Sequence, residues 1–252
     1  MNIRHSLILI VPVFCSSIFL TSTAEAATSG RTLTFAMNDS LQMPRHVRDT
    51  IRSEYKLAIS LPTTVRLDKA IPKNTQLAID LNVSKGGYGM DIFERTKGSN
   101  TSKYDMASLV GDMGTLRNLN SLAIPYDFCD MRRFTSHKTI KLVDGVTAAN
   151  YSNTKTFDNA VIWGNNHWKY IAEGQGSVYA NKTIGMAKTI TGLVTKHGFP
   201  VHHASRGYVQ ALWSGNRPDF TIIWTYNNKQ WYSLSMETLS ETIKTAKTVT
   251  VS

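Results

Sequence analysis

The side chains that could carry out chemistry are few and far apart in the chain. Cys129, in "YDFCDMRR", is the single cysteine outside the first 26 residues. Arg132 and Arg133 would lower the pKa of its thiol, while Asp127 and Asp130 oppose that shift. A lone cysteine without a recognised motif is more typical of a small apolar side chain than of a nucleophile. We therefore interpret Cys129 as structural.

A histidine loop, "KHGFPVHHASRG", brings together His197, His202 and His203. Histidine is a common metal ligand, but adjacent histidines on an extended chain point in opposite directions. No cysteine or carboxylate joins them at a recognised metal-ligand spacing. The pattern favours a polar connection, and the alternative is an envelope hydrolase that uses Cys129 or this loop.

Cofactor motifs are absent from the sequence. The stretch "KGGYG" has neither the lysine-serine pair of a phosphate loop nor the dinucleotide fingerprint, and it is typical of a hairpin turn. No pair of carboxylates stands out in a defined constellation. The sequence thus predicts no cofactor, no metal ion and no catalytic residue.

Two similar stretches, "VIWGNNHWKYI" at 161–171 and "IIWTYNNKQWYSL" at 222–234, carry four of the five tryptophans. The tryptophan at the centre of each β-branched run is expected in the core. The second tryptophan lies beside an Asn-Asn turn, where an aromatic face could stack on a sugar ring and amides could bond its hydroxyls. This pattern predicts a ligand site made of Trp168, Trp231, Asn165, Asn166, Asn227 and Asn228.

A second candidate binding surface is a basic stripe in "PRHVRDTIRSEYKLAIS". Its four cations, at i, i+3, i+7 and i+11, fall on one side of the expected helix, beside its apolar face. They are Arg45, Arg48, Arg52 and Lys56. Asp49 lies within the stripe and can pair with Arg45 or Arg52, which would suit an ordinary solvated face. An anionic surface could otherwise dock there.

Residues 1–26 have the layout of a cleaved signal peptide: a basic start at Arg4, an apolar run, and an A-x-A ending at Ala24 and Ala26. Cleavage would remove one base and one acid, so the net charge of +10 would remain. No other long apolar run exists, so no transmembrane span is expected in the mature chain. We expect secretion or retention in the cell envelope.

The expected fold class is α+β. A helix and a β-hairpin are predicted within 27–135, with a flexible loop near 96–121 because that stretch is rich in Gly, Ser and Asn. Residues 136–252 are predicted to hold two tandem repeats, at about 145–200 and 207–252. Each repeat has three strands followed by a helix.

The landmarks of the repeat are aromatic residues at nearly constant offsets. Trp163 aligns with Trp224 and Trp168 with Trp231, while "TAANYS" aligns with "VQALWS" and so pairs Tyr151 with Trp213. These pairs are expected on equivalent strands. The repeated pattern informs architecture more than chemistry.

The positive charge favours an anionic partner. For an exported protein, an anionic cell-wall polymer or a glycan is favoured, and nucleic acid is the least favoured. The sequence therefore predicts a noncatalytic binding protein of the cell surface or envelope. A further alternative is a structural or assembly protein that binds other proteins through its sheet edges.

Overall fold

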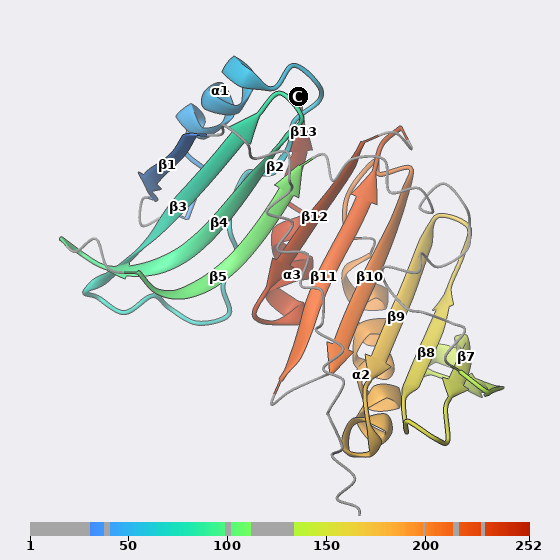
Figure 1. Cartoon of the computed structure of the whole chain (residues 1–252). Coiled ribbons are helices and arrows are strands. Elements are labelled where there is room, and N and C mark those ends of the chain that lie inside the picture. The colour runs from blue at the N-terminus through green and yellow to red at the C-terminus, as the bar shows by residue number, and fades with distance from the viewer. Residues whose placement is uncertain are drawn as a thin grey trace, which may run out of the picture.

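The computed structural model of the 252-residue chain describes residues 31–37, 41–98, 102–111, 134–198, 200–213, 217–227 and 230–252. The predicted signal peptide at 1–26 lies outside these ranges, and so does Cys129. Within them the chain has a mixed α+β fold, built mostly of strands with three α-helices (Figure 1). This agrees with the fold class expected from the sequence.

The elements follow one another along the chain as β1 (Arg31–Ala36), α1 (Arg45–Glu54), β2 (Ser60–Pro62), β3 (Thr75–Ser84), β4 (Gly87–Thr96), β5 (Ser102–Gly111), β6 (Ser136–Lys141), a 3-10 turn at Val143–Gly145, β7 (Thr147–Ser152), β8 (Asn159–Gly164), β9 (Trp168–Gly174), α2 (Ser177–His197), β10 (Arg206–Trp213), β11 (Pro218–Thr225), β12 (Trp231–Met236), α3 (Leu239–Ala246) and β13 (Val249–Val251). Eleven of these strands form one sheet, in the order β1-β3-β4-β5-β12-β11-β10-β9-β8-β7-β6. Neighbours are antiparallel except β9 and β10, which run parallel and are joined through α2. The remaining strands, β2 and β13, pair with each other.

Helix α1 forms where the apolar periodicity predicts it. Val47 and Ile51 lie one turn apart and are fully buried, and Pro44 occupies the N-cap position. Tyr55, the C-cap residue, has an extended backbone, and its buried ring lies edge-on to Tyr88. The helix thus buries one face and leaves its charged face in solvent.

The β3–β4 hairpin also agrees with the sequence. Leu77, Ile79 and Leu81 are buried on the core face of β3, as the period of two predicts, and Ala78 on the other face is buried as well. The two strands pair from Thr75↔Thr96 to Ser84↔Gly87, so the turn lies at the predicted glycine pair.

Strand β5 lies within the expected flexible loop near 96–121 and corrects that expectation for its own residues, while 99–101 and 112–121 lie outside the described residues. Residues 102–111 form a strand paired with β4 on one side and β12 on the other. The local abundance of Gly, Ser and Asn concealed it, because one of its two partners, β12, lies far along the chain, although the other, β4, ends just before it. The pairing of β5 with β12 joins strands from both sides of the expected domain boundary near 135 into one sheet. That boundary remains a prediction.

The elements after residue 145 follow the predicted order. Strands β7, β8 and β9 are followed by α2, and strands β10, β11 and β12 by α3. Trp163 and Trp224 lie on the middle strands, β8 and β11. Each stacks on a tyrosine of the next strand: Trp163 on Tyr170, with ring centroids 5.4 Å apart, and Trp224 on Tyr232, 5.9 Å apart.

Two of the aligned aromatic pairs, however, face opposite sides of the sheet. Trp168 packs in the large core under the helices, whereas Trp231 packs in the small cluster on the other face. Trp213 packs against the large core, and Tyr151 against the small cluster. Side chains alternate between the two faces along a strand, so an alignment that is wrong by one residue pairs side chains on opposite faces. The structurally equivalent residues of β9 and β12 are Tyr170 and Tyr232, which stack on Trp163 and Trp224, and not the tryptophans Trp168 and Trp231 that the sequence alignment pairs.

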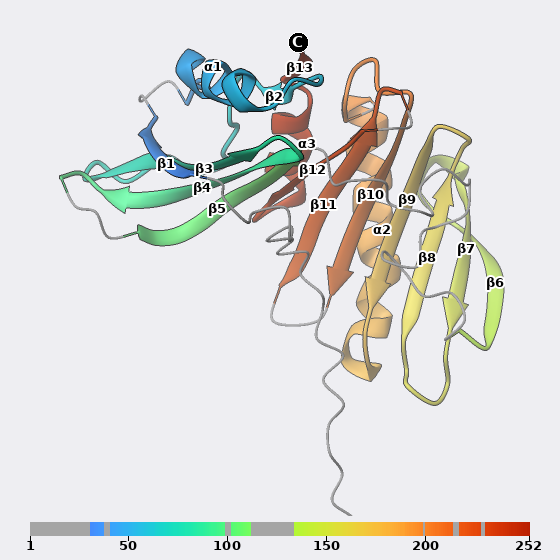
Figure 2. The ribbon, with the colours of Figure 1, turned by 45° about the horizontal axis from the view of Figure 1, so that its top comes forward.

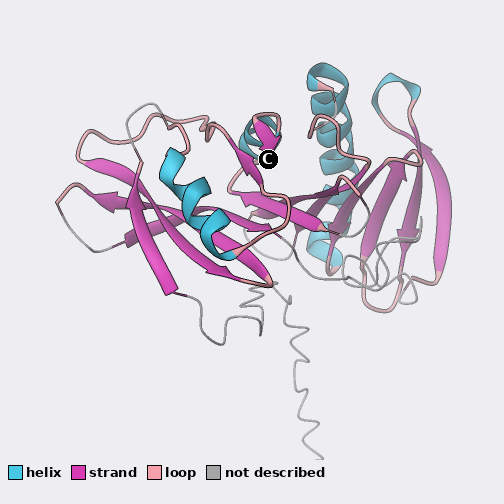
Figure 3. Ribbon diagram, turned by 90° about the horizontal axis from the view of Figure 1, so that it is seen from above, coloured by secondary structure: helices cyan, strands magenta, loops and turns pink. Residues whose placement is uncertain are grey.

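Helices α2 and α3 lie on the same face of the sheet, and Figures 2 and 3 show this from two directions. The buried residues of α1 belong to the same large core. None of the described helices is long and apolar enough to cross a membrane.

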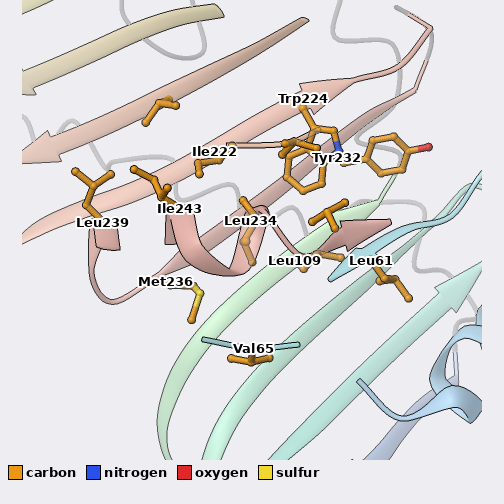
Figure 4. Packing of buried hydrophobic residues seen from close by; sticks show 14 of the residues in the cluster. Leu61, Val65, Leu109, Ile222, Trp224, Tyr232, Leu234, Met236, Leu239 and Ile243 are labelled. Atoms are coloured by element: carbon orange, nitrogen blue, oxygen red, sulfur yellow. The ribbon is translucent and has the colours of Figure 1, made fainter. Parts of the chain in front are cut away.

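The second half of the chain is tied to the first around Ser60, at the start of β2. The Trp224 indole N–H donates to Ser60 Oγ (3.1 Å), and the Tyr88 hydroxyl donates to the Ser60 carbonyl (2.8 Å). Burial raises the pKa of the Tyr88 phenol well above its ordinary value. Figure 4 shows Trp224 and Tyr232 among the apolar side chains of this part of the core, near Leu61 of β2 and Leu109 of β5.

Candidate functional site

The tryptophans of the predicted sugar site are buried. Trp168 is 2% exposed and Trp231 is 1% exposed. The Trp168 ring lies so close to Gly207 of β10 that a Cβ there would come within 2.3 Å of it. Gly207 is therefore required by the close approach of the indole. Neither tryptophan offers a face to a sugar ring, which corrects the prediction that they form a stacking platform.

The asparagines of the same site shape their own turns. Asn165 Oδ1 accepts from the backbone N–H groups of His167 and Trp168, both at 2.8 Å. Asn227 Oδ1 accepts from the N–H of Gln230 at 3.0 Å. Asn166 is exposed, and Asn228 lies outside the described residues. Turn geometry thus explains the first asparagine of each pair, Asn165 and Asn227.

The histidine loop gathers no catalytic or metal-binding group among the described residues. His202 and His203 are exposed, with ring centroids 6.2 Å apart, and His203 has a positive φ of 61°. In the described part of the chain, no three His, Cys, Asp or Glu side chains come together as a metal site. Cys129, the other residue of the hydrolase alternative, lies outside the described ranges.

Helix α1 carries the predicted basic stripe, and two of its four cations are engaged within the protein. Arg48 is half-buried; its guanidinium donates to the Ser252 hydroxyl and to Thr250 Oγ1, the latter at 3.0 Å. Burial, followed by the charge of Arg52, lowers the Arg48 pKa. Lys56 Nζ donates to the carbonyls of Arg52 and Ser53, both at 2.9 Å, and so completes the end of the helix.

The other two cations of the stripe, Arg45 and Arg52, are exposed. The ion pairs among the described residues are Arg217–Glu237 and Lys244–Asp68. Asp49 therefore does not pair with either arginine, although the sequence allowed it. Two guanidinium groups are left facing solvent on one side of α1.

Arg45 and Arg48 also line a hollow of about 350 Å³, which we call the arginine hollow. Its lining residues are Met43, Pro44, Arg45, Arg48, Asp49, Pro62 and Thr63. The wall is fixed by backbone bonds between two extended segments, Met43 N–H to the Thr63 carbonyl and Val65 N–H to the Leu41 carbonyl, both at 2.9 Å. The hollow thus combines a firm backbone wall with two guanidinium groups.

A larger hollow of about 590 Å³ has no lining residue in common with the arginine hollow. We call it the lysine hollow. Its lining residues are Met37, Leu41, Leu67, Asp68, Lys69, Ala70, Ile71, Pro72, Lys73, Thr75, Gln76, Leu77 and Lys97. Sequence reasoning singled out none of them, since their three lysines are spread over 29 positions of loop and strand.

The edges of the large sheet are β1 and β6. Along β6, Lys138 and Lys141 are exposed, and five of its six residues are solvent-exposed. Lysines on an exposed edge discourage a further strand from pairing. This feature weighs against assembly through the β6 edge.

Comparison with known protein families, with curated proteins and with solved structures finds no match to this chain.

Proposed function

We propose that the chain is an exported, noncatalytic binding protein of the cell surface or envelope, and that its ligand is an anionic polymer or glycan. The observation that carries the proposal is the pair of exposed arginines on one side of α1, Arg45 and Arg52, of which Arg45 also lines the arginine hollow. Guanidinium groups bind carboxylate, sulfate and phosphate oxygens through paired donors. The net charge of +10 would steer such a ligand toward the protein.

Export is part of the proposal and comes from the signal-like residues 1–26. Trp168, Trp231, Asn165 and Asn227 are left out of the binding surface, because the tryptophans are buried in the core and the two amides bond their own turns. The proposed surface keeps the exposed arginines of α1 and adds the arginine hollow, which the sequence did not reveal.

We also propose that the two βββα units are a tandem repeat. Their element order is the same, and their helices match in detail: Thr183 and Thr242 are both buried, and each hydroxyl donates to the carbonyl four residues earlier. One turn later in each helix, four residues after the threonine, Ala187 and Ala246 are both fully buried. The stacked tryptophan–tyrosine pairs on the middle strands support the same relation.

The binding test compares charge reversals on two helices. Arg45→Glu/Arg52→Glu alters the proposed surface, and Lys188→Glu/Lys196→Glu makes the same change in net charge on exposed positions of α2. Titration with a sulfated glycan and with polyphosphate should show at least a tenfold loss of affinity for the α1 variant only, since each reversal replaces an attraction of up to about 1 kcal/mol by a repulsion. Neutral dextran should not bind.

An equal loss for both variants would mean that net charge alone determines binding, and this would contradict a specific surface on α1. Unchanged affinity in the α1 variant would contradict it as well. Urea unfolding of each variant shows whether the fold is preserved. A titration over salt concentration should weaken wild-type binding, because the contacts are exposed to solvent.

A further inference from the structure

The lysine hollow has an apolar floor that is continuous with the core. Met37 and Leu77 are buried at its base, and Leu41, Leu67 and Ile71 are half-buried side chains packed against the core. A volume of about 590 Å³ falls within the roughly 300–1,000 Å³ of small-molecule sites. The hollow therefore leaves apolar surface accessible to a ligand of modest size.

The charged groups of the hollow are mostly positive. Lys69 and Lys73 are exposed on its rim, and Lys97 also lines it. Its single lining carboxylate, Asp68, is bonded by two groups of α3: Oδ1 accepts from Lys244 Nζ at 2.7 Å and from the Ser240 hydroxyl. The hollow is thus left with an excess of ammonium groups.

The Asp68 carboxylate is held in this arrangement by several donors of α3 and its cap. The hydrogen bond from Lys244 is the largest cause that lowers the pKa of Asp68. Burial, the next largest, opposes it, and the hydrogen bonds from Ser240 and Thr238 and the charge of Lys244 lower the pKa further. The Asp68 backbone N–H donates in turn to Glu241 Oε1 at 2.8 Å. The loop that bears Lys69 is therefore anchored one residue before the lysine.

Apolar walls with ammonium groups at the rim are complementary to a ligand that has an alkyl chain and an anionic end. We propose that the lysine hollow binds a monomeric long-chain carboxylate, with the alkyl chain along Leu41, Leu67 and Ile71 and the carboxylate at Lys69 and Lys73. This site is separate from the arginines of α1, so it stands or falls independently of the polymer-binding proposal.

The probe is dodecanoate below its critical micelle concentration, and its binding to the chain without residues 1–26 is measured by calorimetry. Wild type should bind it, and Lys69→Glu/Lys73→Glu should weaken binding at least tenfold. Ile71→Asp, which places a charge on the floor, should do the same. Lys188→Glu/Lys196→Glu on α2 is the matched control and should bind as wild type does. Dodecyltrimethylammonium, with the same chain and a positive end, should not bind.

Equal binding of the cationic amphiphile, or unchanged affinity in both hollow variants, would overturn the proposal. Sedimentation with phosphatidylcholine vesicles that contain phosphatidylglycerol distinguishes a membrane surface from a monomer. Binding to these vesicles without binding to monomeric dodecanoate would also overturn it. Urea unfolding confirms that each variant is folded, and the polymer titration with Arg45→Glu/Arg52→Glu is scored separately.

Discussion

The sequence predicts two binding regions, the Asn-Asn turns with their tryptophans, which we call the tryptophan turns, and the basic stripe of α1. Their side chains have opposite environments in the structure. At the turns, Trp168 and Trp231 are buried, and Asn165 and Asn227 bond their own backbone. On α1, half of the cations are engaged within the chain, and the guanidinium groups of Arg45 and Arg52 face solvent. Aromatic and amide side chains can serve the fold entirely, whereas exposed guanidinium groups remain available to a ligand.

Replacement of a turn tryptophan should have the largest effect on stability. Trp231→Ala removes a side chain that is 1% exposed and lies against Tyr208, with ring centroids 6.0 Å apart. We expect the free energy of unfolding to fall by about 3–5 kcal/mol. Trp213→Ala, at a half-buried position, should cost less. Urea unfolding measures both, and a loss of polymer affinity with full stability would bring Trp231 back into the binding surface.

Removal of a turn amide should cost less and should leave binding alone. Asn165→Ala deletes the acceptor of two backbone N–H groups, so the free energy of unfolding should fall by about 0.5–2 kcal/mol, as for a lost cap. Asn166→Ala, its exposed neighbour, should change stability by no more than about 0.5 kcal/mol. If Asn165→Ala instead lowers polymer affinity at unchanged stability, the amide contacts the ligand.

The two stacked tyrosines refine the contrast within the buried region. The Tyr232 hydroxyl donates to the Ala58 carbonyl at 2.9 Å, whereas the buried Tyr170 hydroxyl has no hydrogen-bond partner among the described residues. Burial raises the pKa of Tyr170. Tyr232→Phe should therefore destabilise by about 0.5–1.5 kcal/mol, and Tyr170→Phe should be neutral or stabilising. Equal losses in thermal unfolding would show that Tyr170 also has a partner, such as a water molecule.

The smallest effect is expected at Asp68, which pairs with Lys244. Because the folded-state pKa of Asp68 is depressed, its contribution to stability is present above its ordinary pKa of 3.8 and is lost as pH falls through the lower folded-state value. For so exposed a pair the contribution is about 0.2–1 kcal/mol. The difference in unfolding free energy between wild type and Asp68→Asn should shrink along that acid range. A difference independent of pH would exclude the carboxylate as its source.

Local patterns predicted the elements whose periodicity is complete in the sequence. Val47 and Ile51 mark α1, and the alternation at Leu77 and Ile79 marks β3. Strand β5 was missed because its own composition does not favour a strand, and its hydrogen-bonded pairing with β4 and β12 determines its conformation.

The candidate site was predictable only in part. The stripe on α1 follows from helical spacing, but the engagement of Arg48 depends on Thr250 and Ser252, about 200 positions away. The lysine hollow depends on Leu41, Leu67 and Lys97 meeting in space. Burial of the tryptophans depends on strand register, because a shift of one residue exchanges the two faces of the sheet.

Hydrogen exchange with and without a bound anionic polymer tests the contrast between the two regions most directly. Polyphosphate at saturating concentration should slow amide exchange in residues 41–56 and 59–65, where the arginine hollow and α1 lie, and leave residues 163–170 and 224–232 unchanged. The polymer with Arg45→Glu/Arg52→Glu should give no such protection. Protection confined to the tryptophan turns would contradict the account, because it would place the ligand where the fold leaves no aromatic face exposed.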